Sequence, residues 1–573
     1  MAKVSNKRLR TLLLTDSTEK AKTIRKCVGN QYLVMSSDGF LRDFPKTQLG
    51  IDTENNFEPK YITVRGKGKL LEQIRKESLK ARRIYALTDP DRQGEMIALH
   101  YCDLFGINPS SNFRVVLNEL NKESIKNALN NARPIDQKLV NAFYARRVIE
   151  RIFLYKLNPL LWHKIYRGIT IGLFPALILK IICDQEKKLQ PLNQIIEIAK
   201  DINLDKPLDL KKLQLAAAKE LNFHIGTTAI TLRQLYEGVN VGNSHVGLIT
   251  YYDNEVINIS SENRTPESVK EFLTPNQFKL YNLIWQIVNS NLSINPKIDG
   301  SPTRYNDYSL MLEINSKGLD WSRIFSLSLC GLIKRKFIEL TDEGYKSTKL
   351  GNDVLKVLKE NFSSLITGKT FNKIETQINS VLNDELTTDK AIENFYKQFN
   401  NLFIKACDKL GEDLTPQDPP PIESDEICDK CGRKMLIRRS RYGLFLACSG
   451  YPECKNTKPY IEYLDQKCPK CGGRLTKRRI TRGQITYSCE NFPTCDFSTW
   501  DEPQNRTCEV CGSTLFSHKF KDRAAISYCG NENCSSREDH PINKILEHQK
   551  IKAEAKKQKK LKKFSSDTKT IEE

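Results

Sequence analysis

The sequence predicts a multidomain α/β protein, with a parallel α/β domain first, a mainly helical core next, and three small cysteine-rich units at the end. Two short apolar runs, Leu12–Leu14 and Ile84–Leu87, have the length and composition of buried parallel strands. Helical periodicity dominates the middle of the chain, and 12 of the 17 cysteines lie beyond residue 427. At 573 residues, the chain has room for several domains with separate cores.

Both predicted strands lead into segments that carry chemistry. After the first, Asp16-Ser17-Thr18 provides cap residues for a helix that starts at Glu19. After the second, Asp89-Pro90-Asp91 places two carboxylates at the end of a strand, where both can hold one Mg²⁺ through oxygen. A turn without a metal is the alternative, because Asp-Pro-Asp is also a common turn sequence.

Helical periods follow from Lys122 to about Lys187 and from Asp209 to Tyr236. From Arg304 to Phe362, short helices alternate with the strand-like run Lys336–Leu340 and a turn at Gly344. This order resembles a winged helix. An acidic, proline-rich stretch at residues 411–426 then predicts a stiff, solvated linker.

The three cysteine units have similar spacings, and in each a Cys-x2-Cys-Gly knuckle precedes a second cysteine pair. Glycine in the knuckle permits the positive φ that turns backbone amides toward the sulfurs. Four thiolates per unit predict a closed tetrahedral zinc site, structural and not catalytic, with disulfides as the alternative. The predicted zinc ligands are Cys428, Cys431, Cys448, Cys454, Cys468, Cys471, Cys489, Cys495, Cys508, Cys511, Cys529 and Cys534.

The charge of the chain indicates nucleic acid as its partner. Net charge is +21 with a pI near 9.2, although an AT-rich genome alone also raises lysine content. Basic residues in the cysteine units are mixed with Tyr442, Phe445, Tyr487 and Phe492, which suits a phosphate track with stacking platforms for unpaired bases. The basic residues expected to contact DNA there are Arg438, Arg439, Arg441, Arg478 and Arg479.

Neither the start of the chain nor its longest apolar stretch suggests a membrane protein. The polar, basic start lacks the features of a signal peptide. The longest apolar stretch, Ile169–Cys183, is interrupted by Pro175 and Lys180 and is too short to span a bilayer. We therefore expect a cytoplasmic, chromosome-associated protein without a membrane partner. The basic segment Lys550–Phe564 predicts a frayed helix or a disordered arm, either solubilising or touching DNA.

Several runs, in order along the chain, resemble one family. They are Asp16–Ile24, Asn55–Tyr61, the Asp89 motif, Asn141–Val148, Tyr155–Trp162, Gln234–Gly238, Gly247–Tyr251 and the three cysteine units. In these runs, which are distributed in the family's order over most of residues 10–500, the chain resembles the bacterial-type type IA DNA topoisomerases. The resemblance implies a toprim-type fold for the parallel α/β domain, a helical topoisomerase core and zinc ribbons for the cysteine units.

The resemblance also implies roles for individual residues. Tyr251 would attack a phosphodiester of single-stranded DNA and keep the 5′ phosphate, with Tyr252 as the alternative nucleophile. Asp16 would handle the proton of the leaving 3′ hydroxyl, and Lys20 would pair with the scissile phosphate. A toprim-type Mg²⁺ site would use Asp16, Asp89 and Asp91. The core arginines expected to contact DNA are Arg92, Arg146, Arg147 and Arg304; a surface salt bridge is the alternative for Arg92.

The chain departs from the family pattern near this site. Gln93 replaces a third acid, so Mg²⁺ should bind more weakly. Asp253 stands where the family has an arginine beside the nucleophile, which should cost transition-state stabilisation. Apolar residues 172–176 replace Gly-Arg-Val-Gln-Ser, and residues 319–325 replace Gly-Arg-Pro-Ser-Thr-Tyr-Ala. The family's His-Glu-Ala-Ile-Arg-Pro segment has no counterpart after Tyr251.

A further departure concerns the β-rich arch that opens the gate in the family. The chain has no room for it at either insertion place, between Lys187 and Leu208 or between Asn289 and Arg304. Strand passage by the usual route is therefore not expected.

These observations leave two functions open. The sequence favours a clamp that binds single-stranded or underwound DNA, with strand passage impaired or lost, working as a monomer with three zinc ions and a weakened Mg²⁺ site. The alternative is an active topoisomerase that relaxes negatively supercoiled DNA through Tyr251. The expected domains are residues 8–130 (toprim-like), 131–410 (helical core), 411–426 (linker), 427–462, 466–502 and 506–540 (ribbons), and 545–573 (basic tail).

Overall fold

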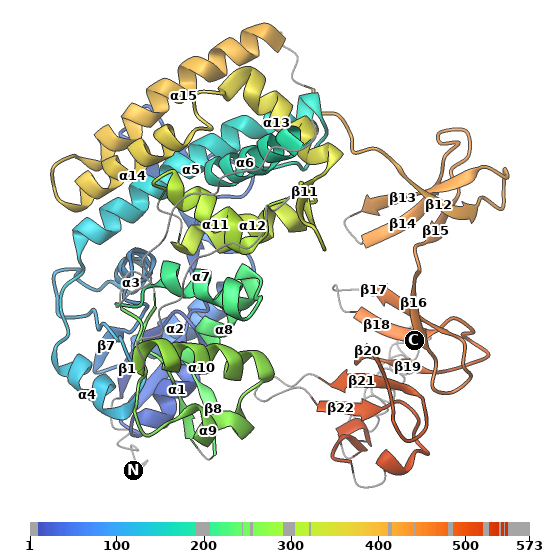
Figure 1. The fold of residues 1–573 in the computed structure, drawn as a ribbon, viewed down its shortest axis with the longest axis horizontal. Helices are drawn as coiled ribbons and strands as arrows, with labels where there is room; N and C mark the ends of the chain where they lie inside the picture. The colour runs from blue at the N-terminus through green and yellow to red at the C-terminus, as the bar shows by residue number, and fades with distance from the viewer. Residues whose placement is uncertain are drawn as a thin grey trace, which may run out of the picture. The chain divides into compact units, whose positions relative to one another are not determined.

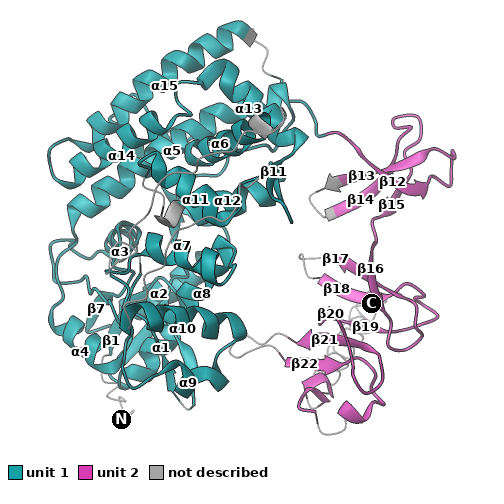
Figure 2. Cartoon of the chain, viewed as in Figure 1, with its two compact units in different colours: residues 1–419 teal, residues 420–573 magenta. Residues whose placement is uncertain are grey.

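The computed structural model divides the chain into two compact units, residues 1–419 and 420–573 (Figure 2). The structure describes residues 10–189, 207–242, 244–252, 256–289, 304–319, 322–410, 415–440, 443–479, 485–518, 526–537, 540–543 and 545–547. Among these residues, no helix is both long and apolar enough to cross a membrane.

The first unit begins with a parallel sheet of order β2-β1-β7, formed by Thr11–Thr15 (β1), Tyr32–Ser36 (β2) and Arg83–Ala86 (β7). Figure 1 labels β1 and β7. A parallel bridge from Ala86 to Arg114 extends the sheet. The central strand is buried on both faces, because Leu12 and Leu14 belong to one core and Leu13 to another. Burial on both faces explains why every residue from Leu12 to Leu14 is apolar. The predicted parallel strands are confirmed.

Helices and short hairpins complete this domain. Ser17 caps helix α1 by accepting a hydrogen bond from the Lys20 amide, so capping falls on the predicted residues and the helix starts at Thr18. The helices are Thr18–Cys27 (α1), Gly68–Ser78 (α2), Arg92–Phe105 (α3) and Lys122–Asn130 (α4). The hairpins pair Arg42–Asp43 (β3) with Ile62–Thr63 (β6), and Ile51–Asp52 (β4) with Glu58–Pro59 (β5).

A helical body packs around the long helix α5. Its elements are Gln137–Lys164 (α5), Leu173–Leu189 (α6), Asp307–Ser316 (α11), Ser322–Lys334 (α12), Ile338–Thr341 (β10), Gly344–Ser347 (β11), Lys349–Phe362 (α13), Gly368–Leu382 (α14) and Thr388–Leu410 (α15). The order helix, helix, hairpin, helix from α11 to α13 matches the predicted winged-helix-like part.

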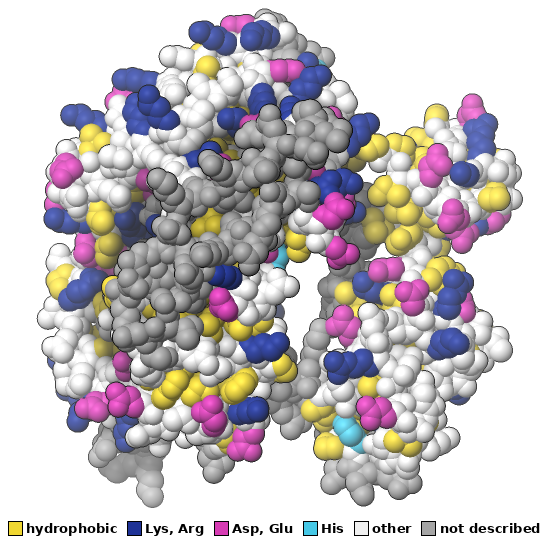
Figure 3. All heavy atoms as spheres, viewed as in Figure 1, with side chains coloured by type: hydrophobic (Ala, Val, Ile, Leu, Met, Phe, Trp, Pro, Cys, Tyr) yellow, Lys and Arg dark blue, Asp and Glu magenta, His cyan; other side chains and the backbone are white. Residues whose placement is uncertain are grey.

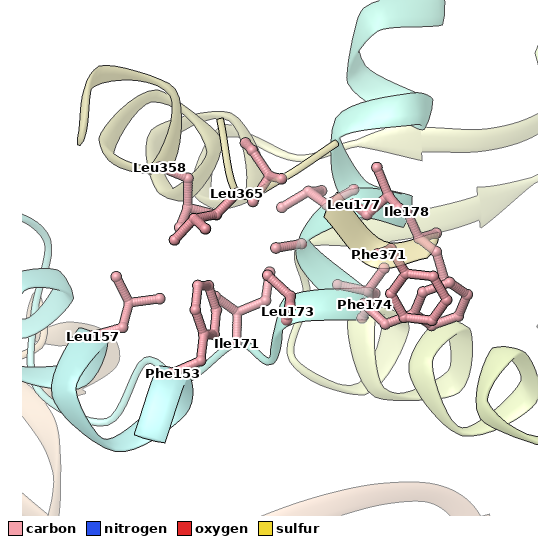
Figure 4. Close-up of a cluster of buried hydrophobic side chains, with 14 of the residues drawn as sticks. Phe153, Leu157, Ile171, Leu173, Phe174, Leu177, Ile178, Leu358, Leu365 and Phe371 are labelled. Atoms are coloured by element: carbon pink, nitrogen blue, oxygen red, sulfur yellow. The ribbon is translucent and has the colours of Figure 1, made fainter. Parts of the chain in front are cut away.

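The apolar segment at residues 172–176 forms part of this body's core. Leu173 and Phe174 are buried, and the Phe174 ring lies 4.7 Å from that of Phe371 on α14 (Figure 4). The apolar residues at this place are therefore matched by inward packing, which stabilises the helical body.

A second helical group connects the tyrosine segment to the sheet. Its elements are Leu210–Glu220 (α7), Ile225–Glu237 (α8), Val239–Val241 (β8), Ser244–Val246 (β9), Pro266–Val269 (α9), Lys270–Phe272 (η1) and Pro275–Asn289 (α10). One continuous core contains Leu13 of the sheet, Leu235 of α8 and Tyr251. The two places where the arch is expected to be missing include residues 190–206 and 290–303, which lie outside the described residues.

The second unit contains three small antiparallel sheets, with strand orders β12-β13-β14-β15, β16-β17-β18-β19 and β20-β21-β22. Their strands are Ile422–Ile427 (β12), Lys434–Ser440 (β13), Gly443–Cys448 (β14), Thr457–Pro459 (β15), Glu462–Lys467 (β16), Arg474–Arg479 (β17), Ile485–Cys489 (β18), Ser498–Thr499 (β19), Glu502–Thr507 (β20), Thr514–His518 (β21) and Ile526–Cys529 (β22); Ser535–Arg537 (η3) follows.

The linker predicted at 411–426 needs correction at its end. Ile422–Ile427 pairs with β13, so the first sheet already begins within that stretch. The Gln417 backbone is also held, since its amide donates to the Trp162 carbonyl and its carbonyl accepts from Arg167. We predicted a solvated linker because the stretch is rich in proline and acidic residues, but such residues do not prevent strand pairing at a sheet edge. The predicted arm at Lys550–Phe564 lies outside the described residues.

Candidate functional site

The segment that carries Tyr251 is fixed against the parallel α/β domain. The Tyr251 amide donates to the Asn118 carbonyl at 2.8 Å, and the residue is 2% exposed. The Tyr236 ring meets it edge-on with centroids 5.2 Å apart, and the Tyr252 ring stacks on it at 5.5 Å. The Tyr251 hydroxyl donates to Asp91 Oδ2 at 2.9 Å. The structure therefore places the predicted nucleophile directly on a carboxylate of the Asp89 motif.

Asp91 takes this position because it is the N-cap residue of α3. Its Oδ1 accepts the Gly94 amide at 2.6 Å, which leaves Oδ2 facing the tyrosine. Glycine is required at position 94, since a Cβ there would collide with the Asp89 carbonyl oxygen. The turn after β7 is thus closed too tightly for any other residue.

Lys20 lies between the other two predicted acids. Its Nζ is 2.5 Å from Asp16 Oδ1 and 2.5 Å from Asp89 Oδ1, and the residue is 1% exposed. Burial lowers the pKa of Lys20, but the two carboxylates outweigh it and hold the pKa above its ordinary value. Burial raises the pKa of Asp89 to about 6; Lys20 opposes this shift, whereas Asp16 and Asp91 add to it.

A buried network that sequence reasoning missed supports this motif. Arg114, fully buried, donates from Nη1 to the Thr88 carbonyl at 3.0 Å and from Nη2 to the Asp89 carbonyl at 2.6 Å. Its Nε donates to Glu95 Oε2 at 2.9 Å, and Arg133 Nη1 donates to Glu95 Oε1 at 2.8 Å. Glu95 is the last residue of the motif and is followed directly by an apolar helical run. This position in the sequence could have indicated that its side chain faces inward.

The residues suit Mg²⁺ in chemistry, because Asp16, Asp89 and Asp91 offer carboxylate oxygens from one edge of the sheet. In the described arrangement, however, Lys20 already occupies the space between Asp16 and Asp89, and Asp91 is engaged by Gly94 and Tyr251. A metal ion held by these residues would displace Lys20 from at least one carboxylate.

The core arginines expected to contact DNA all have partners within the chain. Arg92 donates to Asn379 at 3.2 Å, Arg146 pairs with Glu375 at 2.6 Å, Arg147 with Asp43 at 2.5 Å, and Arg304 with Glu186 at 3.4 Å and with Glu343. Arg147 also lies over the rings of Phe40, Phe44 and Phe143. The hydrogen-bond and ion-pair partners named here lie on α6, α14, β3 and the turn between β10 and β11.

The twelve predicted zinc ligands form three sets of four sulfurs, and within each set all sulfurs lie within 4.8 Å of one another. Cys431 and Cys448 are 3.2 Å apart, and Cys468 and Cys495 are 3.8 Å apart. A tetrahedral Zn–S₄ site has sulfur–sulfur edges of about 3.8 Å, whereas a disulfide bond is about 2.05 Å long. The knuckle glycines have φ of +70°, +77° and +70°, as the spacing predicted. The three zinc sites are confirmed and disulfides are not.

The aromatic residues of the ribbons differ in exposure. Phe492 is 56% exposed, as a stacking platform requires, but Tyr487 is buried in its sheet and Phe445 is half-buried, so those two expectations need correction. Tyr451, at the position in the first ribbon that matches Phe492, is 64% exposed and was missed. Trp500 is exposed as well.

The basic residues of the ribbons are described only in part. Arg438 is exposed and Arg478 is half-buried. Arg441, Tyr442 and the side chains of Arg439 and Arg479 lie outside the described part of the chain. On the face shown in Figure 3, lysine and arginine side chains are spread over both units and mixed with acidic ones.

Comparisons with known proteins match two parts of the chain to domain families and the fold to one solved structure. Residues 11–120 match the family described as Toprim domain. Residues 425–462 and 465–504 match the family described as Topoisomerase DNA binding C4 zinc finger. The fold is similar to that of full-length topoisomerase I from Thermotoga maritima, with a TM-score of 0.62 and 22% sequence identity over 83% of this chain and 100% of that chain. The chain therefore carries a toprim domain followed by topoisomerase-type C4 zinc ribbons, on a fold similar to that of a bacterial topoisomerase I.

Proposed function

We propose that this protein binds single-stranded or underwound DNA and cleaves and reseals one strand through Tyr251. The observation that carries the proposal is the hydrogen bond from the Tyr251 hydroxyl to Asp91, beside Lys20 and its two carboxylates. A binding protein alone would have no need to hold a tyrosine hydroxyl against a buried acidic cluster, because leaving such groups without function costs stability.

In the proposed reaction, the Tyr251 oxygen attacks phosphorus and Asp91 accepts the hydroxyl proton. The P–O bond to the tyrosine forms, the bond to the 3′ oxygen breaks, and that oxygen takes a proton from the Lys20, Asp16 and Asp89 cluster. Mg²⁺, when bound, would neutralise charge on the phosphate. Resealing reverses each step, so no nucleotide is consumed.

DNA capture falls to the ribbons in this proposal. Phe492 and Tyr451 present exposed rings that can stack on unpaired bases, and Arg438 provides exposed positive charge. We assign the chemistry to residues 8–130 and 131–410, and strand capture to the three ribbon domains.

The second candidate function is a DNA clamp without chemistry. One observation favours it: Lys20 is held by two carboxylates and is 1% exposed, so it is not available to a phosphate in the described arrangement. The departures at Gln93 and Asp253 and the expected loss of the arch point the same way, although Asp253 and residues 190–206 and 290–303 of the two arch places lie outside the described residues.

A suicide-cleavage assay separates the two. Single-stranded oligonucleotides labelled at either end are incubated with the wild type and with Tyr251→Phe, with and without Mg²⁺. The proposal predicts a denaturation-resistant adduct on the 5′ phosphate with the wild type, absent from Tyr251→Phe, while both bind DNA equally. Equal binding without any adduct would establish the clamp instead. Tyr252→Phe is the matched control and should still form the adduct.

A further inference from the structure

The last turn of α8 is attached from two sides to the candidate site of Lys20, the three aspartates and Tyr251, which we call the centre. Thr23 of α1, one turn after Lys20, donates to the Glu237 carbonyl. Tyr236 donates to the Leu117 carbonyl at 2.9 Å, and its ring contacts both tyrosines of the nucleophile segment. The end of α8 is therefore fixed relative to both Lys20 and Tyr251.

Arg233 lies on this same part of α8. It precedes Tyr236 by three residues and Glu237 by four, and residues at these spacings share a helix face. Its Nε lies 3.0 Å from Glu237 Oε1, and its side chain is 61% exposed. Within the described part of the chain, its two Nη groups have no hydrogen-bond acceptor. The cation is thus oriented from one side and open to solvent on the other.

The electrostatic surroundings of Arg233 include the centre itself. Burial lowers the pKa of Arg233, but Glu237 raises it above its ordinary value, and Tyr252 and Asp89 contribute in the same direction. Both of these residues belong to the segments that carry the proposed nucleophile and the acid cluster.

The centre needs such a cation because its own charge is negative. Asp16, Asp89 and Asp91 bring three carboxylates, and Lys20 neutralises only one of them. A phosphodiester adds another negative charge, and the attack of Tyr251 concentrates charge on its non-bridging oxygens.

We propose that Arg233 binds a non-bridging oxygen of the phosphate that Tyr251 attacks, with Glu237 holding the guanidinium in place. This inference rests on the proposed function. Arg233 keeps its protons throughout: the bond to the Tyr251 oxygen forms, the bond to the 3′ oxygen breaks, and the two Nη groups donate to the phosphate. Two parallel donors suit a phosphate, and a lysine offers only a point charge in their place.

The test measures the rate of adduct formation and, separately, the affinity for the same single-stranded oligonucleotide. Arg233→Gln should slow the adduct about 10- to 100-fold while changing affinity less than about 3-fold. Arg233→Lys should recover part of the rate. The control is Lys279→Gln, which removes one exposed charge from α10, a helix packed against α8, and should match the wild type.

A second substrate makes the test specific for charge at the phosphate. Once the cleavage position is mapped, a neutral methylphosphonate at that position should shrink the defect of Arg233→Gln, whereas a merely structural role for Arg233 would leave the defect unchanged. Wild-type rates from Arg233→Gln, or a defect that persists on the methylphosphonate, would overturn the inference alone. No adduct from the wild type would overturn the proposed function, and the inference with it.

Discussion

The buried network behind the Asp89 motif makes the most specific stability prediction. Glu95 accepts four hydrogen bonds, from Arg114 Nε, from Arg133 Nη1 and Nη2, and from the Asp136 amide, at 2.7–3.1 Å. Glu95 and Arg114 are both fully buried, so Glu95→Gln leaves an arginine charge without its counter-ion in the interior. Removing one partner of a buried ion pair costs about 3–5 kcal/mol. We take about 3 kcal/mol, because glutamine keeps one acceptor.

Hydrogen exchange on the full chain measures this cost locally, where a single unfolding midpoint of several domains would not. A loss of about 3 kcal/mol should speed exchange of the β1, β7 and α3 amides roughly 100-fold. Glu77→Gln is the matched control, because Glu77 pairs with Lys80 at the surface and should cost less than about 1 kcal/mol. Unchanged exchange in Glu95→Gln would refute the view that this ion pair holds the motif.

The network also predicts a pH dependence of its own. Burial raises the pKa of Glu95, but Arg133, Arg114 and the Asp136 amide outweigh it and hold the pKa below its ordinary value of 4.5. A carboxyl whose pKa is lowered on folding stabilises the protein above its unfolded pKa and loses that contribution as the pH falls through the folded value. The stabilisation is therefore complete at neutral pH and is lost only in acid below about pH 4.5.

Three further predictions follow from the metal sites and the ribbons. Chelation of zinc should weaken single-strand binding more than about 10-fold without changing exchange in the parallel α/β domain, because only the ribbons need the metal; unchanged affinity would rule the ribbons out as DNA contacts. Calorimetric Mg²⁺ affinity should rise between pH 5 and 7, because a proton competes for Asp89, whose pKa is about 6; a flat profile, or one that Asp89→Asn leaves in place, would contradict this. Phe492→Ser and Tyr451→Ser should each weaken oligonucleotide binding about 10-fold through lost base stacking, whereas Val510→Ser, at an equally exposed position of the third ribbon, should leave binding unchanged.

Local patterns in the sequence predicted the elements whose causes are local. The strand β1 is readable because both of its faces are buried, so every residue from Leu12 to Leu14 is apolar. The zinc ligands are readable because the knuckle fixes the first cysteine pair within four residues and the hairpin returns the second pair to it. Capping by Ser17 follows from its position before the first helical turn.

Contacts between distant segments were not predictable in the same way. Arg146 and Glu375 are separated by more than two hundred residues, and nothing near Arg146 indicates that a carboxylate of α14 will neutralise it. Tyr487 has an aromatic ring that could stack on a base, but in the register of β17 and β18 this residue is buried. Arg114 gave no signal at all, since its acceptors are backbone carbonyls of the motif and a glutamate on α3.

The sequence and the structure each account for a different part of the Tyr251 site. The family resemblance pointed to this residue, and the structure adds the partner, because Asp91 faces the tyrosine only after its other oxygen has capped α3. The acid that receives the proton in our proposal is therefore selected by helix capping, a feature that the spacing of the two aspartates alone does not reveal.

The most direct measurement is mass spectrometry of the trapped protein–DNA adduct after protease and nuclease digestion. We predict a nucleotide joined through its 5′ phosphate to the peptide that contains Tyr251, with fragment ions that place it on Tyr251 and not on Tyr252 or Tyr236. An unmodified Tyr251 peptide, recovered under conditions in which the DNA is fully bound, would contradict the account and leave the protein as a DNA clamp.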